Sequence, residues 1–93
     1  MSVDLLPFEQ VAALFHAVGD VARLKLLVIL AKDEKCLQEL VNLTHDDAPT
    51  ISHRLKLLQQ SGLIDKRRSG KFVYYFITQH TANAFVLNLL HTL

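Results

Sequence analysis

The sequence of 93 residues has little of several residue types, and each shortage excludes a class of protein. Its single cysteine, Cys36, excludes an internal disulfide bond and suits a reducing cytosol. None of its three glycines belongs to a glycine-rich phosphate-binding loop, and no set of nucleophile, base and orienting residue stands out, so we expect no enzymatic activity. No apolar run reaches the length of about 18 residues that a membrane span requires. The first ten residues do not resemble a secretion signal, so we expect one cytoplasmic domain over residues 1–93.

The net charge of +1 conceals an uneven distribution of charge. Residues 1–49 contain four basic and eight acidic residues, a net charge of −4. Residues 50–75 contain six basic residues against Asp65 alone, a net charge of +5, and residues 76–93 contain no Asp, Glu, Lys or Arg. A basic block inside a near-neutral chain indicates contact with a polyanion, although a solvated face with counterions would have the same composition.

Helical spacing of apolar residues predicts two helices in the first third of the chain. The first begins near Pro7 and ends at Gly19. Asp20 can cap the second by accepting backbone N–H bonds. Residues 23–31 of this second helix are almost all aliphatic, so we expect it to lie in the core.

Two shorter helices are predicted next. After the polar turn at residues 32–35, a third helix begins at Cys36. Asp47 can cap a fourth helix, and Gly62 suits its C-terminal end. The apolar residues of this fourth helix fall on one side and predict a buried stripe of Ile51, Leu55 and Leu58.

The spacing of apolar residues then changes from helix to strand. Residues 63–68 and 71–78 are rich in strand-forming residues, and Ser69-Gly70 between them is a turn signal, so a β-hairpin is predicted. A last helix, beginning near Ala82, carries a full apolar stripe. The predicted fold is therefore mainly α, in the order α-α-α-α-β-β-α.

Within this order, the third and fourth helices are short, amphipathic and joined by a tight turn. They form a helix-turn-helix over about residues 36–61, and the hairpin over about residues 63–78 forms a wing. A recognition helix needs small or hydrogen-bonding residues in its first turns to approach base edges in the major groove. The start of the fourth helix has them, and we predict DNA contacts from Pro49, Thr50, Ser52, His53, Arg54 and Lys56.

The tip of the predicted hairpin is a compact positive loop. It would lie over a phosphate backbone or enter the minor groove, although a charged solubilising turn has the same composition. We predict further DNA contacts from Lys66, Arg67, Arg68, Ser69, Gly70 and Lys71.

Four consecutive blocks, VARLKLLVIL, KCLQELVNLT, APTISHRLKLLQQSGLI and KRRSGKFVYYFI, resemble the ArsR/SmtB family of winged-helix bacterial repressors. The resemblance covers roughly residues 11–90, and one departure is Val21 where the family commonly has proline after Asp20. It implies a homodimer packed through the first and last helices, with recognition helices about one DNA turn apart on a palindromic operator. It also implies that an inducer, which the sequence does not identify, releases the DNA.

Many members of this family sense metals, so the resemblance also directs attention to two metal sites. In the third helix, Cys36 matches the first cysteine of the family's Cys-x-Cys, but Gln38 replaces the second. Glu39 would stand in for an acidic ligand. The family completes this site with Cys or His from an N-terminal arm, and the seven residues before the first predicted helix contain neither.

The family's second site combines Asp-x-His on one last helix with His-x-x-Glu or His-x-x-His on its partner. Gln79 and Thr81 occupy the first pair of positions here, His80 lies between them, and no acid follows Asp65. Two ligands do not close a tetrahedral zinc site. We therefore predict no cofactor; the candidates for zinc or another divalent metal are Cys36, Glu39, His80 and His91.

The sequence thus predicts a DNA-binding transcriptional regulator that acts as a homodimer on double-stranded DNA. The alternative is a winged-helix module that binds proteins and not DNA. The basic block disfavours that alternative, because a protein-only surface would not need Arg67, Arg68 and Lys71 beside Arg54.

Overall fold

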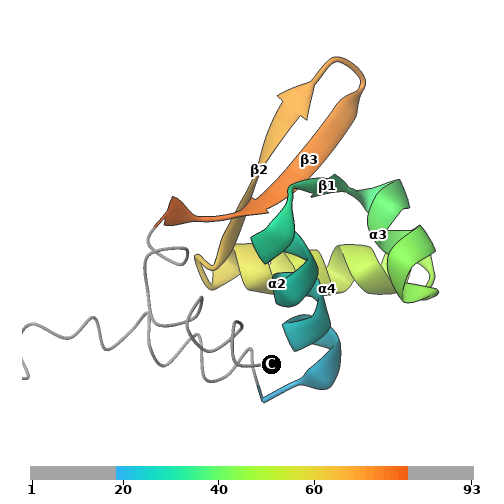
Figure 1. Cartoon of the computed structure of the whole chain (residues 1–93), viewed down its shortest axis with the longest axis vertical. Helices are drawn as coiled ribbons and strands as arrows, with labels where there is room; N and C mark the ends of the chain where they lie inside the picture. The colour runs from blue at the N-terminus through green and yellow to red at the C-terminus, as the bar shows by residue number, and fades with distance from the viewer. Residues whose placement is uncertain (1–18, 80–93) are drawn as a thin grey trace, which may run out of the picture.

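The computed structural model of the chain describes residues 19–79 (Figure 1). Three helices form a compact body, and a long hairpin projects from it. The elements are α2 (Val21–Lys32), β1 (Lys35–Cys36), α3 (Leu37–Thr44), α4 (Ala48–Gln60), β2 (Ile64–Ser69) and β3 (Phe72–Ile77). The predicted first and last helices lie outside the described residues. Among residues 19–79, no helix is long and apolar enough to cross a membrane.

Aliphatic side chains from the three helices and from the foot of the hairpin meet in one core. The predicted stripe of α4 is fully buried in it, which confirms the prediction for the fourth helix. Leu26 and Leu27 of α2 are equally inaccessible, so the aliphatic segment of that helix is central, as expected. The buried cluster consists of Leu26, Leu27, Leu30, Leu40, Ile51, Leu55, Leu58, Leu63 and Ile64.

Both predicted helix caps are present. The backbone N–H of Arg23 donates to Asp20 Oδ1 at 3.1 Å, and that of Thr50 donates to Asp47 Oδ1 at 2.8 Å. Each bond satisfies an N–H that has no partner inside its own helix. At the other end of α4, Gly62 adopts a φ of +77°, the left-handed conformation that ends a helix at little steric cost to glycine.

The start of the third helix differs from the prediction. Lys35 and Cys36 form a short strand, so the polar turn ends one residue earlier than expected and the helix begins at Leu37. The sheet therefore has three antiparallel strands in the order β1-β3-β2, with Lys35 opposite Tyr75 and Cys36 opposite Tyr74. Cys36 is held extended because its N–H donates to the carboxylate of Glu39 at 3.0 Å, which caps α3.

The hairpin turn lies one residue later than predicted. Ser69 pairs with Phe72 across the two strands, so the turn residues are Gly70 and Lys71 instead of Ser69 and Gly70. Gly70 has a φ of +62°, whereas Lys71 does not have a positive φ. A positive φ at the first of two turn residues matches a type II′ hairpin, for which glycine is the preferred residue.

We predict that the stability of the domain depends on the cap of α4. Replacing Asp47 with alanine removes the acceptor, and the melting temperature should fall by roughly 4–8 °C at fixed protein concentration. Asp47→Asn is the matched control, because an asparagine side chain also caps helices. A melting temperature unchanged in Asp47→Ala would contradict this role.

The same variants separate the charge of Asp47 from its capping geometry. Hydrogen bonds from Thr50 hold the pKa of Asp47 below its usual value. The stabilisation is therefore complete above the unfolded pKa of about 3.9 and is lost as the pH falls through the lower folded pKa. Between pH 5 and pH 2, thermal denaturation should show a larger loss of stability for the wild type than for Asp47→Asn.

Candidate DNA-binding surface

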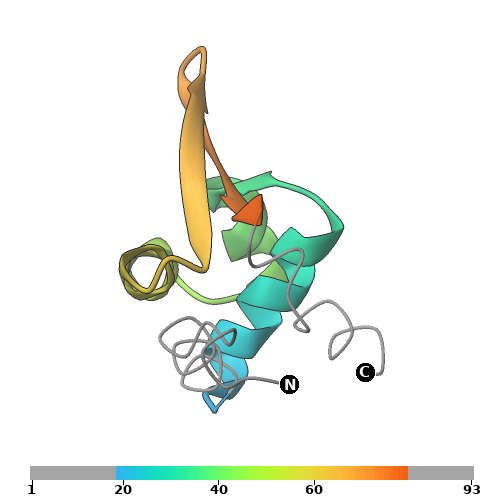
Figure 2. The same cartoon turned by 90° about the vertical axis from the view of Figure 1, so that its left-hand side faces the viewer.

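The outer side of α4 is polar and open to solvent. Ser52, His53 and Lys56 are exposed, and Pro49 in the first turn is exposed as well. The opposite side of the helix is fully buried, so packing against the core fixes which residues face outward. Figure 2, which looks along α4, shows the helix next to the foot of the wing. Four of the predicted contact residues in α4 are thus available to a ligand.

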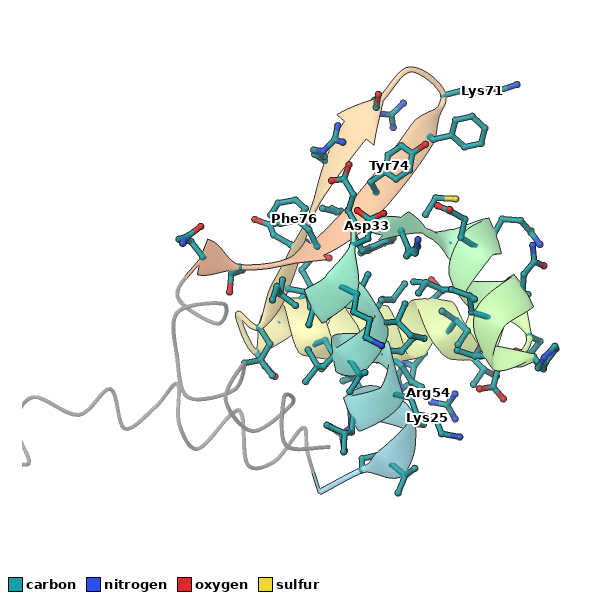
Figure 3. All side chains as sticks on the ribbon, viewed as in Figure 1. Lys25, Asp33, Arg54, Lys71, Tyr74 and Phe76 are labelled. Carbon is teal, nitrogen blue, oxygen red and sulfur yellow. The ribbon has the colours of Figure 1, made fainter. Side chains whose placement is uncertain are left out.

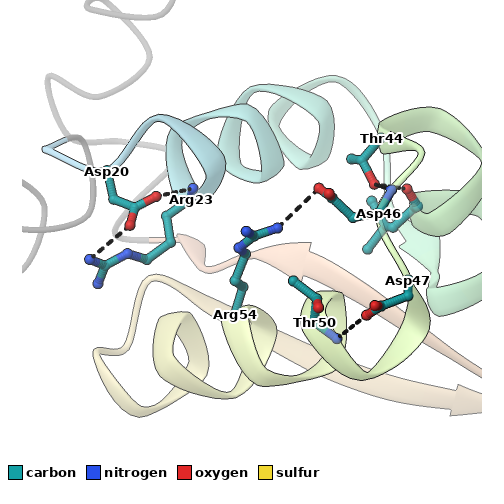
Figure 4. A network of polar contacts seen from close by, with 8 residues as sticks. Asp20, Arg23, Thr44, Asp46, Asp47, Thr50 and Arg54 are labelled. Atoms are coloured by element: carbon teal, nitrogen blue, oxygen red, sulfur yellow. Dashed lines mark hydrogen bonds and ion pairs between the residues drawn. The ribbon is translucent and has the colours of Figure 1, made fainter.

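The other two predicted residues of this helix lie in different surroundings. Thr50 is half-buried and supplies the N–H that Asp47 accepts. Arg54 is half-buried, and its Nη1 donates to Asp46 Oδ2 at 3.0 Å (Figure 4). The backbone N–H of Thr50 and the side chain of Arg54 thus both connect α4 to the turn before it. Arg54 is therefore engaged within the protein in this structure.

That turn is itself held by a chain of hydrogen bonds. The N–H of Asp46 donates to Thr44 Oγ1 at 3.3 Å, and this hydroxyl donates to the carbonyl of Leu40 at 2.8 Å (Figure 4). His45 closes α3 in the left-handed conformation, with a φ of +63°. Together with the Arg54–Asp46 ion pair, these bonds fix the angle between the two helices of the helix-turn-helix.

A polar groove separates α4 from the wing. It has a volume of about 440 Å³ and is lined by Ser52, Lys56, Gln59, Gln60, Lys66 and Tyr75. Lysines thus stand on both of its sides, one on the helix and one on the strand. Gln59, Gln60 and Tyr75 were not among the predicted residues. Helical spacing from Ser52 and Lys56 would have located the two glutamines, whereas Tyr75 requires the strand register opposite Lys66.

The wing distributes its charges over two faces. Side chains alternate along a strand, and residues opposite each other share a face. Lys66 pairs with Tyr75 and Arg68 with Val73, so both cations lie on the face that meets the groove. Arg67 pairs with Tyr74 on the reverse face. The three consecutive cations therefore do not form one patch: Lys66 and Arg68 lie on one face of the hairpin and Arg67 on the other.

The tip of the wing is open. Ser69, Gly70 and Lys71 are all exposed, and the Lys71 side chain extends from the end of the hairpin (Figure 3). Its ammonium lies 5.5 Å from the ring centre of Phe72, within reach of a cation–π contact. The structure thus combines an exposed helix face, a lysine-lined groove and a basic hairpin tip.

A helix-turn-helix followed by a wing is also what the comparisons with known proteins find. Residues 20–66 match the family model described as bacterial regulatory protein, arsR family. The chain belongs to the ArsR family. Its members are transcriptional regulators with a winged helix-turn-helix DNA-binding domain, so both the expected family and the expected kind of function are confirmed.

Individual relatives agree with this assignment. An uncharacterized HTH-type transcriptional regulator of Methanocaldococcus jannaschii is 34% identical over 75% of this chain and 80% of that protein. A transcriptional repressor SmtB homolog of Synechocystis is 35% identical over 96% of this chain, which spans only 63% of the length of that relative. Among solved structures, the homodimeric winged helix-turn-helix DNA-binding domain of a possible ArsR-family regulator from Mycobacterium bovis matches with a TM-score of 0.77. It is 30% identical, over 91% of this chain and 80% of that one.

The described residues do not fit the metal site that the family implies in its third helix. Cys36 is buried, and the carboxylate of Glu39 already accepts the N–H of Cys36. Over residues 19–79, no three His, Cys, Asp or Glu side chains come together in a group that could hold a metal ion. His80 and His91 lie outside the described residues. Cys36 and Glu39 are better explained as a buried apolar side chain and a helix cap.

We predict little or no zinc binding by Cys36 and Glu39, because two ligands leave a tetrahedral site half empty. Titration calorimetry with zinc on the wild type and on Cys36→Ala should give indistinguishable weak isotherms. A tight, stoichiometric isotherm that is lost in Cys36→Ala, with zinc releasing bound DNA, would overturn this prediction.

Proposed function

We propose that this protein binds double-stranded DNA as a homodimer and represses transcription from a palindromic operator until a signal releases it. In this proposal α4 enters the major groove, and the wing lies over the adjacent backbone. The signal is left open. The observation that carries the proposal is the groove between α4 and the wing, with Lys56 on one side and Lys66 on the other.

The chemistry of this groove suits a phosphate backbone. Lys56 and Lys66 present ammonium groups to a polar channel, and Ser52, Gln59 and Gln60 add hydrogen-bonding groups that suit phosphate oxygens or base edges. Arg68 extends the same positive face along β2, and Lys71 adds an exposed cation at the tip of the wing. A duplex that received α4 in its major groove would pass a phosphate strand through this channel.

Dimer formation is supported by similarity. The solved structure from Mycobacterium bovis is of a homodimeric domain of the same fold. A chain of 93 residues buries a modest share of its surface alone, so a shared interface would add to its stability. Two recognition helices related by a two-fold axis would match the symmetry of a palindromic site.

The proposal predicts strong salt dependence of binding. Lys56, Lys66, Arg68 and Lys71 would give four phosphate contacts per subunit and about eight per dimer, so the slope of log affinity against log salt should be near −7. Fluorescence anisotropy with duplexes from the DNA upstream of the protein's own gene, at 50–300 mM salt, measures this slope. Absence of binding at the lowest salt would count against DNA binding and favour a protein-interaction module.

Substitutions in α4 should distinguish contacts to base edges from contacts to phosphates. Ser52→Ala should weaken specific binding by ~1–3 kcal/mol if a base contact is lost, and Thr50→Ala and Arg54→Ala should also weaken it. Lys56→Ala should weaken binding to all duplexes alike and reduce the salt slope. The matched control is Lys32→Ala, which removes an exposed lysine at the end of α2, away from the groove, and should change neither. Unchanged affinity and sequence preference in Thr50→Ala, Ser52→Ala and Arg54→Ala would exclude α4 as the recognition helix.

A further inference from the structure

Arg67 is the one wing cation on β2 that the strand register directs away from the groove. Its guanidinium is bound by Glu34, which lies 33 positions earlier in the chain, immediately before β1. Arg67 Nε donates to Glu34 Oε2 at 3.0 Å, and Nη2 donates to the other carboxylate oxygen. Such a two-point contact fixes the plane of the guanidinium as well as its position.

Tyr74 completes the surroundings of Arg67. The guanidinium carbon lies 5.4 Å from the centre of the Tyr74 ring, within the range of a cation–π contact. Tyr74 is opposite Arg67 on one side and opposite Cys36 on the other, so it is the central residue of the three paired strands. Arg67 therefore connects β2 to β3 through Tyr74, and to the segment before β1 through Glu34.

The charge on this side of the wing is unfavourable for DNA. The cavity beside Arg67 has a volume of about 460 Å³, and its lining includes three carboxylates, those of Asp33, Glu34 and Glu39. The hydrogen bond from Cys36 lowers the pKa of Glu39, so that carboxylate is ionised at neutral pH. Lys35 pairs with Asp33 at 3.6 Å and Arg67 with Glu34, so the three acidic and two basic groups carry a net charge of −1. A phosphate strand approaching this face would meet a weakly negative site, in contrast to the lysine-lined groove on the other face.

We propose that Arg67 is a positioning residue for the wing and that Glu34 and Tyr74 are its partners, so that Arg67 directs Lys66 and Arg68 toward the duplex without contacting a phosphate itself. This inference rests on the proposed DNA binding. It differs from the sequence-based expectation, in which every cation of the wing contacts DNA. The Arg67 and Glu34 side chains are 49% and 34% exposed, so their ion pair adds little to global stability and acts mainly on the orientation of the hairpin.

The test compares salt slopes, which count phosphate contacts, among variants of the full chain. Arg68→Ala should reduce the magnitude of the slope by about 1.8 per dimer, because two phosphate contacts are lost. Arg67→Ala should leave the slope unchanged, because Lys66 and Arg68 still reach their phosphates in the complex, while the cost of ordering the hairpin lowers the affinity about two- to fivefold per subunit. Glu34→Gln should cause a similar loss with the same slope, and the double variant should bind no more weakly than Arg67→Ala.

Arg67→Lys is the conservative variant, and it carries the test if Arg67→Ala does not fold. Lysine keeps the positive charge but cannot make the planar two-point contact, so affinity should fall as in Glu34→Gln, again at constant slope. Tighter binding by Glu34→Gln, or a slope in Arg67→Ala reduced as much as in Arg68→Ala, would show that Arg67 contacts phosphate and would overturn the inference alone. A wild type that binds no duplex at low salt would instead overturn the proposed function, and the inference with it.

Discussion

The burial of one side of α4 is the constraint on which the rest of this structure depends. Ile51, Leu55 and Leu58 are inaccessible to solvent and pack with leucines of α2 and α3. Residues of a helix are related by a fixed rotation and rise. Burying these three side chains on one side of α4 therefore determines which of its other residues face solvent. The polar face that would meet DNA is therefore set by apolar contacts on the opposite side of the helix. Leu55→Ala would leave a cavity beneath the helix and loosen this orientation.

Polar contacts add to the apolar core by fixing where α4 begins and how the turn and the wing are held. The Asp47 cap determines where α4 begins, and the Arg54–Asp46 pair connects that helix to the turn before it. On the wing, Glu34 and Arg67 connect residues that are distant in sequence. Asp46 and Glu34 each pair with an arginine that a search for cations would assign to DNA. Arg54 and Arg67 are thus held by acidic partners, whereas the proposed DNA-binding surface consists mostly of exposed lysines, small polar residues and Arg68.

Much of this arrangement could be predicted from the sequence because its signals are local. Apolar spacing located the three helices of residues 19–79, Asp20 and Asp47 marked two of their starts, and the strand-forming run at residues 72–77 indicated the hairpin. Strand β1 could not be predicted, since two residues carry no periodicity and pair only with a distant strand. For the same reason the partners of Arg54 and Arg67 were missed: proximity to Asp46 and Glu34 follows from tertiary packing. The placement of the wing cations needed the register of β2 and β3, which the turn at Gly70 fixes.

The alternation of faces along β2 has a consequence for how such a wing can change during evolution. Replacing Lys66 with arginine or Arg68 with lysine leaves each charge on its original face. Inserting a single residue between Arg68 and Ser69 would shift the pairing of the three cations by one and move each of them to the opposite face, because the turn at Gly70 fixes the register. Arg67 would then enter the groove, and its two neighbours would face the carboxylates of Asp33, Glu34 and Glu39. Strand length is thus a stronger constraint on this wing than the identity of its basic residues.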